Sequence, residues 1–234
     1  MSAISAGACG LETVVVRGSA EVCYHDDSVL PGGGHILLAT PTLPKEIVAA
    51  KKSTSVMHVA LLRGINVGKA KRVPMAELRA LCEGLGYGDV KTLLNSGNVV
   101  FSAPRVDAMA AAKIQKAIAT RIGVTCRVIV VTAAELDRIV EENPFAEGEA
   151  NPPRFLVTVF AGEADRARAA ELAKEEWGVE RLAVGSIAAY LWCPNGILES
   201  RIVATIAKQL GDGATSRNWA TIKKLQTLVA GGAE

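Results

Sequence analysis

The sequence predicts an α+β protein built of two ferredoxin-like (α/β-plait) subdomains, each with an open mixed or antiparallel sheet and helices packed on it. From residue 57 onward, short apolar runs alternate with amphipathic segments of helical length, which predicts helices layered on sheets. Pairs of strands separated by short turns stand beside longer crossovers, and this mixture favours ferredoxin-like sheets over a doubly wound parallel sheet. Each half is small, so we expect the two halves to pack together and complete a core.

The chain is expected to divide into four parts. The first part is interrupted by a Pro-Gly-Gly-Gly run and two further prolines, which predicts a poorly ordered leader or an extension upstream of the natural start at Met57. An acidic, proline-containing stretch in the middle of the chain is typical of a linker. The predicted parts are a leader at 1–56, a first subdomain at 57–146, a linker at 147–153 and a second subdomain at 154–234.

The first subdomain shows strand and helix patterns in alternation. Pro74 is expected to open the first helix, a position where its missing N–H costs nothing. Thr132 and Glu135 have the spacing of a capping box, which predicts a helix start. The predicted elements are a strand at 58–62, a helix at 74–86, a hairpin of strands at 90–94 and 99–101, a helix from about Asp107 to Gly123, a strand at 127–131 and a helix ended by Pro144.

The second subdomain repeats this alternation. Its last helix carries Trp219 and Ile222 on one apolar face, so we expect Trp219 in the core, and Thr215 has the chemistry to cap that helix. The predicted elements are a strand at 155–160, a helix at about 164–177, two strands within 180–193 that turn near Gly185, a helix at 199–210 and a final helix after Thr215.

Composition excludes several classes of protein. The formal net charge of +2 is too small for a histone-like or membrane-surface protein, and no apolar run is long enough to span a bilayer, so we expect no membrane contact. The five cysteines form no CxxC pair and are odd in number, which argues against a disulfide framework and a zinc cage and favours a cytoplasmic location. No catalytic motif of the common hydrolase or zinc-protease kinds is present, and we expect no cofactor and no metal site.

The loop between the first strand and the first helix, residues 63–72, is the most informative segment. It carries four cations and no acid, and it leads into the positive end of a helix dipole. Its glycines allow a ligand to approach the backbone closely. Clustered cations, a flexible backbone and a helix N-terminus favour phosphate or carboxylate binding, although the segment lacks the P-loop spacing and a solvated basic turn remains the alternative. The residues assigned to this loop are Arg63, Gly64, Asn66, Gly68, Lys69 and Lys71.

Two further polar clusters complete the predicted ligand site. Asn95, Ser96 and Asn98 lie in the expected hairpin turn, where conformational preference alone also explains them. Arg217 and Asn218 lie at the expected start of the last helix. A cation there opposes the helix dipole, so Arg217 is expected to have a partner, either an anionic ligand or a carboxylate elsewhere in the fold.

Three distinctive stretches of the chain lie at 60–68 together with 71–75, at 94–101 and at 215–221. In combination they resemble a bacterial family, domain of unknown function 1697. The resemblance implies a pair of α/β-plait subdomains and implies no activity. The chain differs from the usual family pattern because Gly68 is followed directly by Lys69 and because Ala220 stands where an asparagine is common.

The sequence therefore favours a binder, at most weakly catalytic, of an anionic small molecule or nucleic acid. The ligand class includes nucleotides, although aromatic residues are few and the aromatic strand pattern of RNA-binding plaits is absent. One alternative is an enzyme acting on a phosphorylated or carboxylated small metabolite, clamped by Arg63 and Arg217. The other is a structural module whose polar motifs only maintain turns.

Overall fold

The computed structural model of the protein describes residues 55–66 and 71–231. The predicted leader before Ser55, and Gly68 and Lys69 of the predicted loop site, lie outside the described residues. The first half consists of β1 (Val56–Arg63), α1 (Met75–Gly84), β2 (Gly88–Leu93), β3 (Asn98–Ala103), α2 (Ala110–Arg121), β4 (Arg127–Thr132), α3 (Ala133–Glu141) and α4 (Ala146–Ala150). After a short 3-10 turn at Pro152–Arg154 come β5 (Phe155–Phe160), α5 (Glu163–Leu172), β6 (Arg181–Val184), β7 (Ala188–Trp192), α6 (Arg201–Leu210), a second 3-10 turn at Gly211–Gly213, β8 (Ala214–Asn218) and α7 (Trp219–Ala230).

Each half contains one four-stranded antiparallel sheet. The strand orders are β2-β3-β1-β4 and β6-β7-β5-β8, so the first strand of each half is central and is flanked by the third and fourth strands. In β1, Leu61 lies opposite Asn98 on one side and Ile129 on the other. The predicted α+β class with two sheet–helix subdomains is confirmed, and both sheets are of the antiparallel kind.

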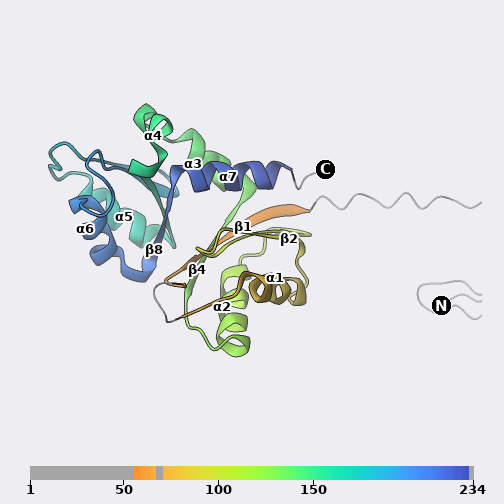
Figure 1. Ribbon diagram of the computed structural model, residues 1–234. Coiled ribbons are helices and arrows are strands. Elements are labelled where there is room, and N and C mark those ends of the chain that lie inside the picture. The colour runs from red at the N-terminus through yellow and green to blue at the C-terminus, as the bar shows by residue number, and fades with distance from the viewer. Residues whose placement is uncertain (1–54, 67–70, 232–234) are drawn as a thin grey trace, which may run out of the picture. The chain divides into compact units, whose positions relative to one another are not determined.

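Three hydrophobic clusters bury the two sheets. One face of the first sheet packs against α1 and α2, and one face of the second sheet packs against α5 and α6 (Figure 1). The third cluster lies between the sheets and joins residues of both halves, such as Val59, Val157 and Tyr190, with α3 and α7. Because β1 is buried on both faces, its sequence is a continuous apolar run instead of an alternating pattern.

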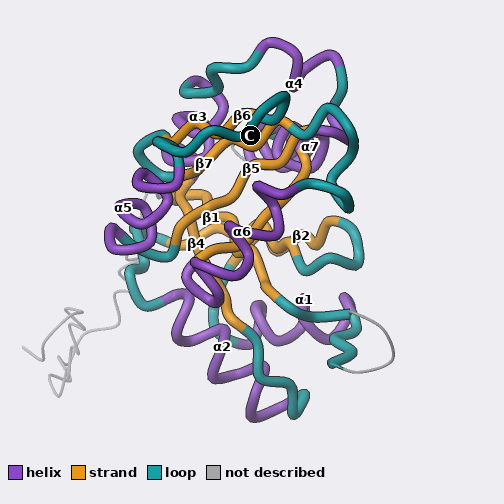
Figure 2. The backbone as a smooth tube through the Cα atoms, turned by 90° about the vertical axis from the view of Figure 1, so that its left-hand side faces the viewer, coloured by secondary structure: helices purple, strands orange, loops and turns teal. Residues whose placement is uncertain are grey.

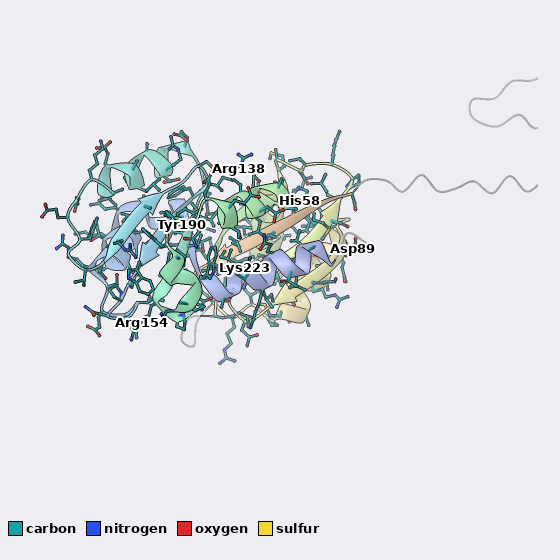
Figure 3. All side chains as sticks on the ribbon, turned by 90° about the horizontal axis from the view of Figure 1, so that it is seen from above. His58, Asp89, Arg138, Arg154, Tyr190 and Lys223 are labelled. Atoms are coloured by element: carbon teal, nitrogen blue, oxygen red, sulfur yellow. The ribbon has the colours of Figure 1, made fainter. Side chains whose placement is uncertain are left out.

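The junction between the halves is helical. The predicted linker at 147–153 contains most of α4 and the first 3-10 turn. Tyr190, labelled in Figure 3, extends from β7 and donates its hydroxyl to the carbonyl of Ile139 in α3 at 2.7 Å. The two halves are therefore connected by a buried polar contact as well as by the shared core.

Three details of the second half differ from the sequence prediction. Thr215 does not cap the last helix: it lies in β8, a strand absent from the prediction, and Asn218 caps α7 instead. The strand escaped prediction because its side chains are mostly polar, and its pairing with β5 includes a partly buried hydroxyl contact of 2.8 Å between Thr158 and Ser216. Helix α5 ends at Leu172, before the predicted limit, and the indole of Trp177 donates to the Leu172 carbonyl.

The cysteines of the described chain are buried or half-buried. Cys82 and Cys193 are buried, as expected for small apolar residues, and Cys126 is half-buried. Burial raises the pKa of the Cys82 thiol to about 12, which keeps it protonated at neutral pH.

Candidate functional site

The order of strands brings the predicted loop, the predicted hairpin turn and Arg217 to one end of the first sheet. Because β1 pairs with β3, the end of β1 lies beside the β2–β3 turn, and the Leu62 amide donates to the Gly97 carbonyl at 2.8 Å. The side-chain amide of Asn66 donates to the Asn95 carbonyl at 2.7 Å, which connects the loop to the turn. Arg217 reaches the same place from β8 and donates to the Leu62 carbonyl at 2.7 Å.

Asn66 closes the base of the β1–α1 loop. Its backbone adopts a left-handed conformation with φ 55°, which asparagine tolerates better than most residues. Its side chain accepts the Val73 amide at 2.8 Å and donates to the Val73 carbonyl at 3.2 Å, and its own amide donates to the Lys71 carbonyl. Asn66 is thus a fixed part of the loop framework, whatever binds to the loop.

Glycine is required at position 97 of the β2–β3 turn for two reasons. Its φ of 75° lies in the left-handed region, and a Cβ there would come within 2.6 Å of the Ile65 Cδ1 atom and 2.8 Å of the Leu62 Cβ atom. Gly64 has a similar φ of 71°, but a Cβ on Gly64 would meet no atom within 4 Å, so only its conformation favours glycine. The close approach at position 97 is what lets the turn lie against the end of β1.

Arg217 is a buried cation whose bonding partners are neutral. Its side chain lies in a strand and not at a helix start, which corrects the placement expected from the sequence. Burial lowers the pKa of its guanidinium to about 10. No described carboxylate contacts it, and every nitrogen of the guanidinium donates within the chain. Its acceptors are Oδ1 of Asn98 at 2.5 Å, the Thr215 hydroxyl, and the carbonyls of Leu62, Ser96, Gly97 and Ser216.

Asn98 connects Arg217 to the turn. Its side chain is fully buried; the amide nitrogen donates to the Leu93 carbonyl at 2.8 Å and to the Ser96 hydroxyl at 3.0 Å. Its amide oxygen accepts from Arg217. Asn98 therefore has a structural part in this arrangement and presents no free polar atom to the surface.

Arg63 and Asn218 also have partners inside the chain. The Arg63 guanidinium donates to the Ala214 carbonyl at 2.7 Å and lies 3.6 Å from the exposed Asp212 carboxylate. Asn218 accepts the amide of Thr221 at 2.9 Å and its hydroxyl at 2.6 Å, which makes it the N-cap of α7. Arg63 remains partly exposed, whereas Asn218 is used by the helix.

Three exposed polar side chains at this end of the sheet have no bonding partner among the described residues. Lys71, Arg72 and Asn95 form no side-chain hydrogen bond and no ion pair with any described residue; we call them the basic loop surface. The helix that follows, α1, has Pro74 as its N-cap and no side chain bonded to its first amides. Lys71 has φ 54°, so the backbone turns sharply beside these cations. Cations beside an uncapped helix start form an electropositive surface.

A second polar cluster, absent from the sequence prediction, lies where β3 leads into α2. The Asp107 carboxylate accepts from the Tyr87 hydroxyl at 2.9 Å and from Lys113 Nζ at 2.7 Å. The Asp107 amide donates to Nε2 of His58 at 3.3 Å; His58, labelled in Figure 3, is buried in β1. The hydrogen bond from Lys113 is the main cause that holds the pKa of Asp107 below its ordinary range. Only assembly of the strands brings these residues together, so no local sequence signal identifies the cluster.

Comparison with known proteins supports one assignment. The profile of DUF1697, described as "Protein of unknown function (DUF1697)", matches residues 56–190, more than half of the chain. The protein belongs to the DUF1697 family. The match confirms the resemblance drawn from the loop and turn motifs, while the stretch at 215–221 lies beyond the matched residues.

The fold of this DUF1697 protein is shared with a solved structure. The conserved bacterial protein SP0830 from Streptococcus pneumoniae is 22% identical, with a TM-score of 0.64 over 75% of this chain and 99% of the other. At that identity the likeness shows the fold alone. No curated protein matches the chain. Among the described residues, no helix is long and apolar enough to cross a membrane, and no group of three metal-binding side chains is found.

Proposed function

We propose that the protein binds an anionic, phosphate- or carboxylate-bearing ligand at the basic loop surface. The observation that carries this proposal is the pair of exposed cations, Lys71 and Arg72, unpaired within the described chain and next to the uncapped start of α1. Gly68 and Lys69 of the predicted loop site lie outside the described residues. We place this binding in the cytoplasm, the compartment that the cysteine content favours.

The motif residues divide into two groups under this proposal. Asn66, Gly97, Asn98 and Arg217 form a framework that fixes the loop and the turn, because their polar atoms are already bonded within the chain. The basic loop surface contacts the ligand. A rigid framework below solvated cations lowers the entropy cost of ligand binding.

We favour a nucleotide-like small molecule as the ligand over an RNA strand bound across the face of a sheet. We infer that each half is a ferredoxin-like plait, since each has the connection order β-α-β-β-α-β and the strand order given above. Plaits that bind RNA use an open sheet face with aromatic side chains. Here both faces of both sheets carry buried clusters, so nucleic acid would have to bind through the loop.

Binding measured across a salt series tests the proposal. Labelled single-stranded RNA and a labelled nucleoside triphosphate are titrated into the full-length protein, its Lys71→Ala and Arg72→Ala variants, and Lys208→Ala as a control. Lys208 is exposed on α6 and its removal changes the charge equally. Each lost phosphate contact should reduce the slope of log K against log salt by about 0.7 for a single strand. Equal binding by all four proteins, or no binding of either probe at low salt, would discard this surface.

The runner-up function is an enzyme acting on a phosphorylated or carboxylated small metabolite. A clamp made by Arg63 and Arg217 receives little support, because the donors of Arg217 are used by six oxygen atoms of the chain. The Asp107 cluster offers titratable groups, yet each is bonded to another. Native mass spectrometry of the purified protein separates the two: a retained metabolite whose mass changes on incubation would favour the enzyme.

A further inference from the structure

Strand β4 is an edge of the first sheet, and part of its outer side is already occupied by side chains. The Val128 amide donates to Oε1 of Gln115 at 2.8 Å, and the Thr132 amide donates to the Glu135 carboxylate at 2.7 Å. Since amides alternate in direction along an antiparallel strand, Val128, Val130 and Thr132 all turn their backbone groups away from β1. Gln115 and Glu135 thus cover two of these three outward positions.

Val130 is the position between them that is left open. Its amide and carbonyl face outward, and no described residue forms a hydrogen bond with either. An edge residue with a free donor and a free acceptor is a template for an added strand. The half-buried Val130 side chain packs on the α2 side of the sheet.

A groove of about 550 Å³ runs along this edge. One wall is the start of α2 together with the turn before it, and it presents the small residues Ala108, Ala111 and Ala112; the other wall comes from the second half around Phe160 and Ile187. Figure 2 shows β4 at the edge of its sheet with α2 and α5 beside it. The alanines leave room for the side chains of an extended chain, and the volume is within the range of ordinary small-ligand sites.

One charged group in the groove lacks a partner within the described chain. The acids that line it are all bonded: Asp107 to Lys113, Glu135 to Thr132, and Glu163 to Arg166. Arg127 makes no ion pair and no side-chain hydrogen bond with any described residue.

The register adds a second reason to expect an anion at Arg127. Arg127 lies directly opposite Arg63 on the neighbouring strand. Two like charges in cross-strand register repel each other, and the Asp212 carboxylate beside Arg63 is itself mostly exposed, at 88%. A negative group on the open side of Arg127 would relieve this repulsion.

We propose that the groove binds an extended, acidic peptide segment of another protein, which adds to β4 as an antiparallel strand. A single free residue offers one donor and one acceptor, and only in an antiparallel pair do both bond the same residue of the incoming strand. With an apolar peptide residue opposite Val130, the residue three positions further along the peptide lies opposite Arg127, once the Gln115 side chain has swung away from the Val128 amide to admit the peptide backbone. The recognised pattern is therefore an apolar residue followed, three residues later, by Asp or Glu on the face of Arg127.

Nuclear magnetic resonance titration of the full-length, nitrogen-15-labelled protein tests this assignment. The probe is the heptapeptide Gly-Thr-Val-Thr-Val-Glu-Gly with both ends blocked, compared with the same peptide carrying Gln in place of Glu. We expect the Val130 amide signal to move saturably with both peptides, and the Gln peptide to bind roughly two- to fivefold more weakly, the factor of a cross-strand ion pair. N-methylation of the first valine of the peptide should abolish the shift by removing its donor.

Protein variants assign the ion pair. Arg127→Gln should lower affinity for the Glu peptide to the level of the Gln peptide and leave the Gln peptide unaffected, while Lys208→Gln, an equal charge change on α6, should alter neither. Absence of a saturable shift at Val130 would overturn strand addition. Equal affinities of the Glu and Gln peptides for the unaltered protein would overturn the role of Arg127.

Discussion

At the scale of single residues, the polar motifs of this DUF1697 protein are mainly devices that hold backbone to backbone. Arg217 shows this most clearly, because a buried guanidinium without a counter-ion is costly unless its donors are satisfied. Here the acceptors include carbonyls of β1 and of the β2–β3 turn, together with Asn98. Sequence reasoning identified Arg217 as a cation in need of a partner, but backbone carbonyls carry no signal in the sequence.

Replacing Arg217 with methionine keeps much of the side-chain volume and removes every donor. The buried carbonyl of Leu62 and the amide oxygen of Asn98 would lose a partner, and we expect a loss of about 3 kcal/mol in the free energy of unfolding. Urea denaturation followed by circular dichroism measures this. The matched variant Arg72→Met, at an exposed position, should stay within about 0.5 kcal/mol. Equal stability of the two variants would mean that Arg217 is dispensable to the junction.

Gly97 and Gly64 separate a steric requirement from a conformational one. Both have positive φ, so alanine at either position should cost about 1 kcal/mol from backbone strain. Only at position 97 would the new methyl group meet Ile65 at 2.6 Å, which adds an overpacking cost of about 1–3 kcal/mol. In thermal melting, Gly97→Ala should therefore have a clearly lower melting temperature than Gly64→Ala. A larger loss of stability for Gly64→Ala would contradict the packing described for the turn.

At the scale of elements, prediction worked where a strand or helix had an apolar pattern of its own. The β2–β3 hairpin and the capping box of α3 were both predicted from local spacing, and both are present. Strand β8 was missed because its residues have no apolar run; it is a strand because β5 pairs with it. Because this strand was not predicted, the predicted start of the last helix came too early and Arg217 was assigned to the helix instead of to β8.

The cap of α7 gives a test at this scale. Asn218→Ala removes the acceptor of the Thr221 amide and should cost about 1 kcal/mol of stability, whereas Asn218→Asp keeps the acceptor and should cost far less. Denaturant unfolding measures the free energy of unfolding of the two variants. If Asn218→Ala proved neutral, the helix would have to start elsewhere.

The connection from β3 to α2 is expected to make stability depend on pH. The pKa of Asp107 is held below its ordinary value of 3.8, chiefly by the hydrogen bond from Lys113. A carboxyl with a depressed folded-state pKa stabilises the fold above its unfolded-state pKa, and that contribution disappears as pH falls through the folded-state value. The stability difference between the unaltered protein and Asp107→Asn should therefore shrink on acidification below about pH 4. Melting curves of both proteins recorded from neutral to acidic pH measure this stability difference. A stability difference that stays constant with pH would show that Lys113 does not lower the pKa of Asp107.

At the scale of the whole described chain, the decisive feature is the core between the two sheets. Repeated strand–helix patterns predicted two subdomains and the need to complete a core, but not which faces meet. The faces are set by alternation in the central strands: Val59 and Leu61 turn toward the shared core, while Ala60 and Leu62 turn toward α1 and α2. A continuous apolar strand gives no hint of this difference, because both of its faces are buried.

The shared core predicts that the two halves unfold as one cooperative unit. Leu225, on α7, is fully buried in that core beside residues of the first sheet, so Leu225→Ala should cost about 2–5 kcal/mol. Because the loss acts on the global transition, hydrogen exchange of first-half amides such as Val100 should accelerate as much as that of Val157 in the second half. Two independently stable halves would instead show accelerated exchange in the second half alone, and urea unfolding would then separate into two transitions. The contacts of Arg217 give a structural reason for such coupling. From β8 its guanidinium donates to the carbonyls of Leu62 and Gly97 in the first half, so unfolding of either half would expose the same buried groups.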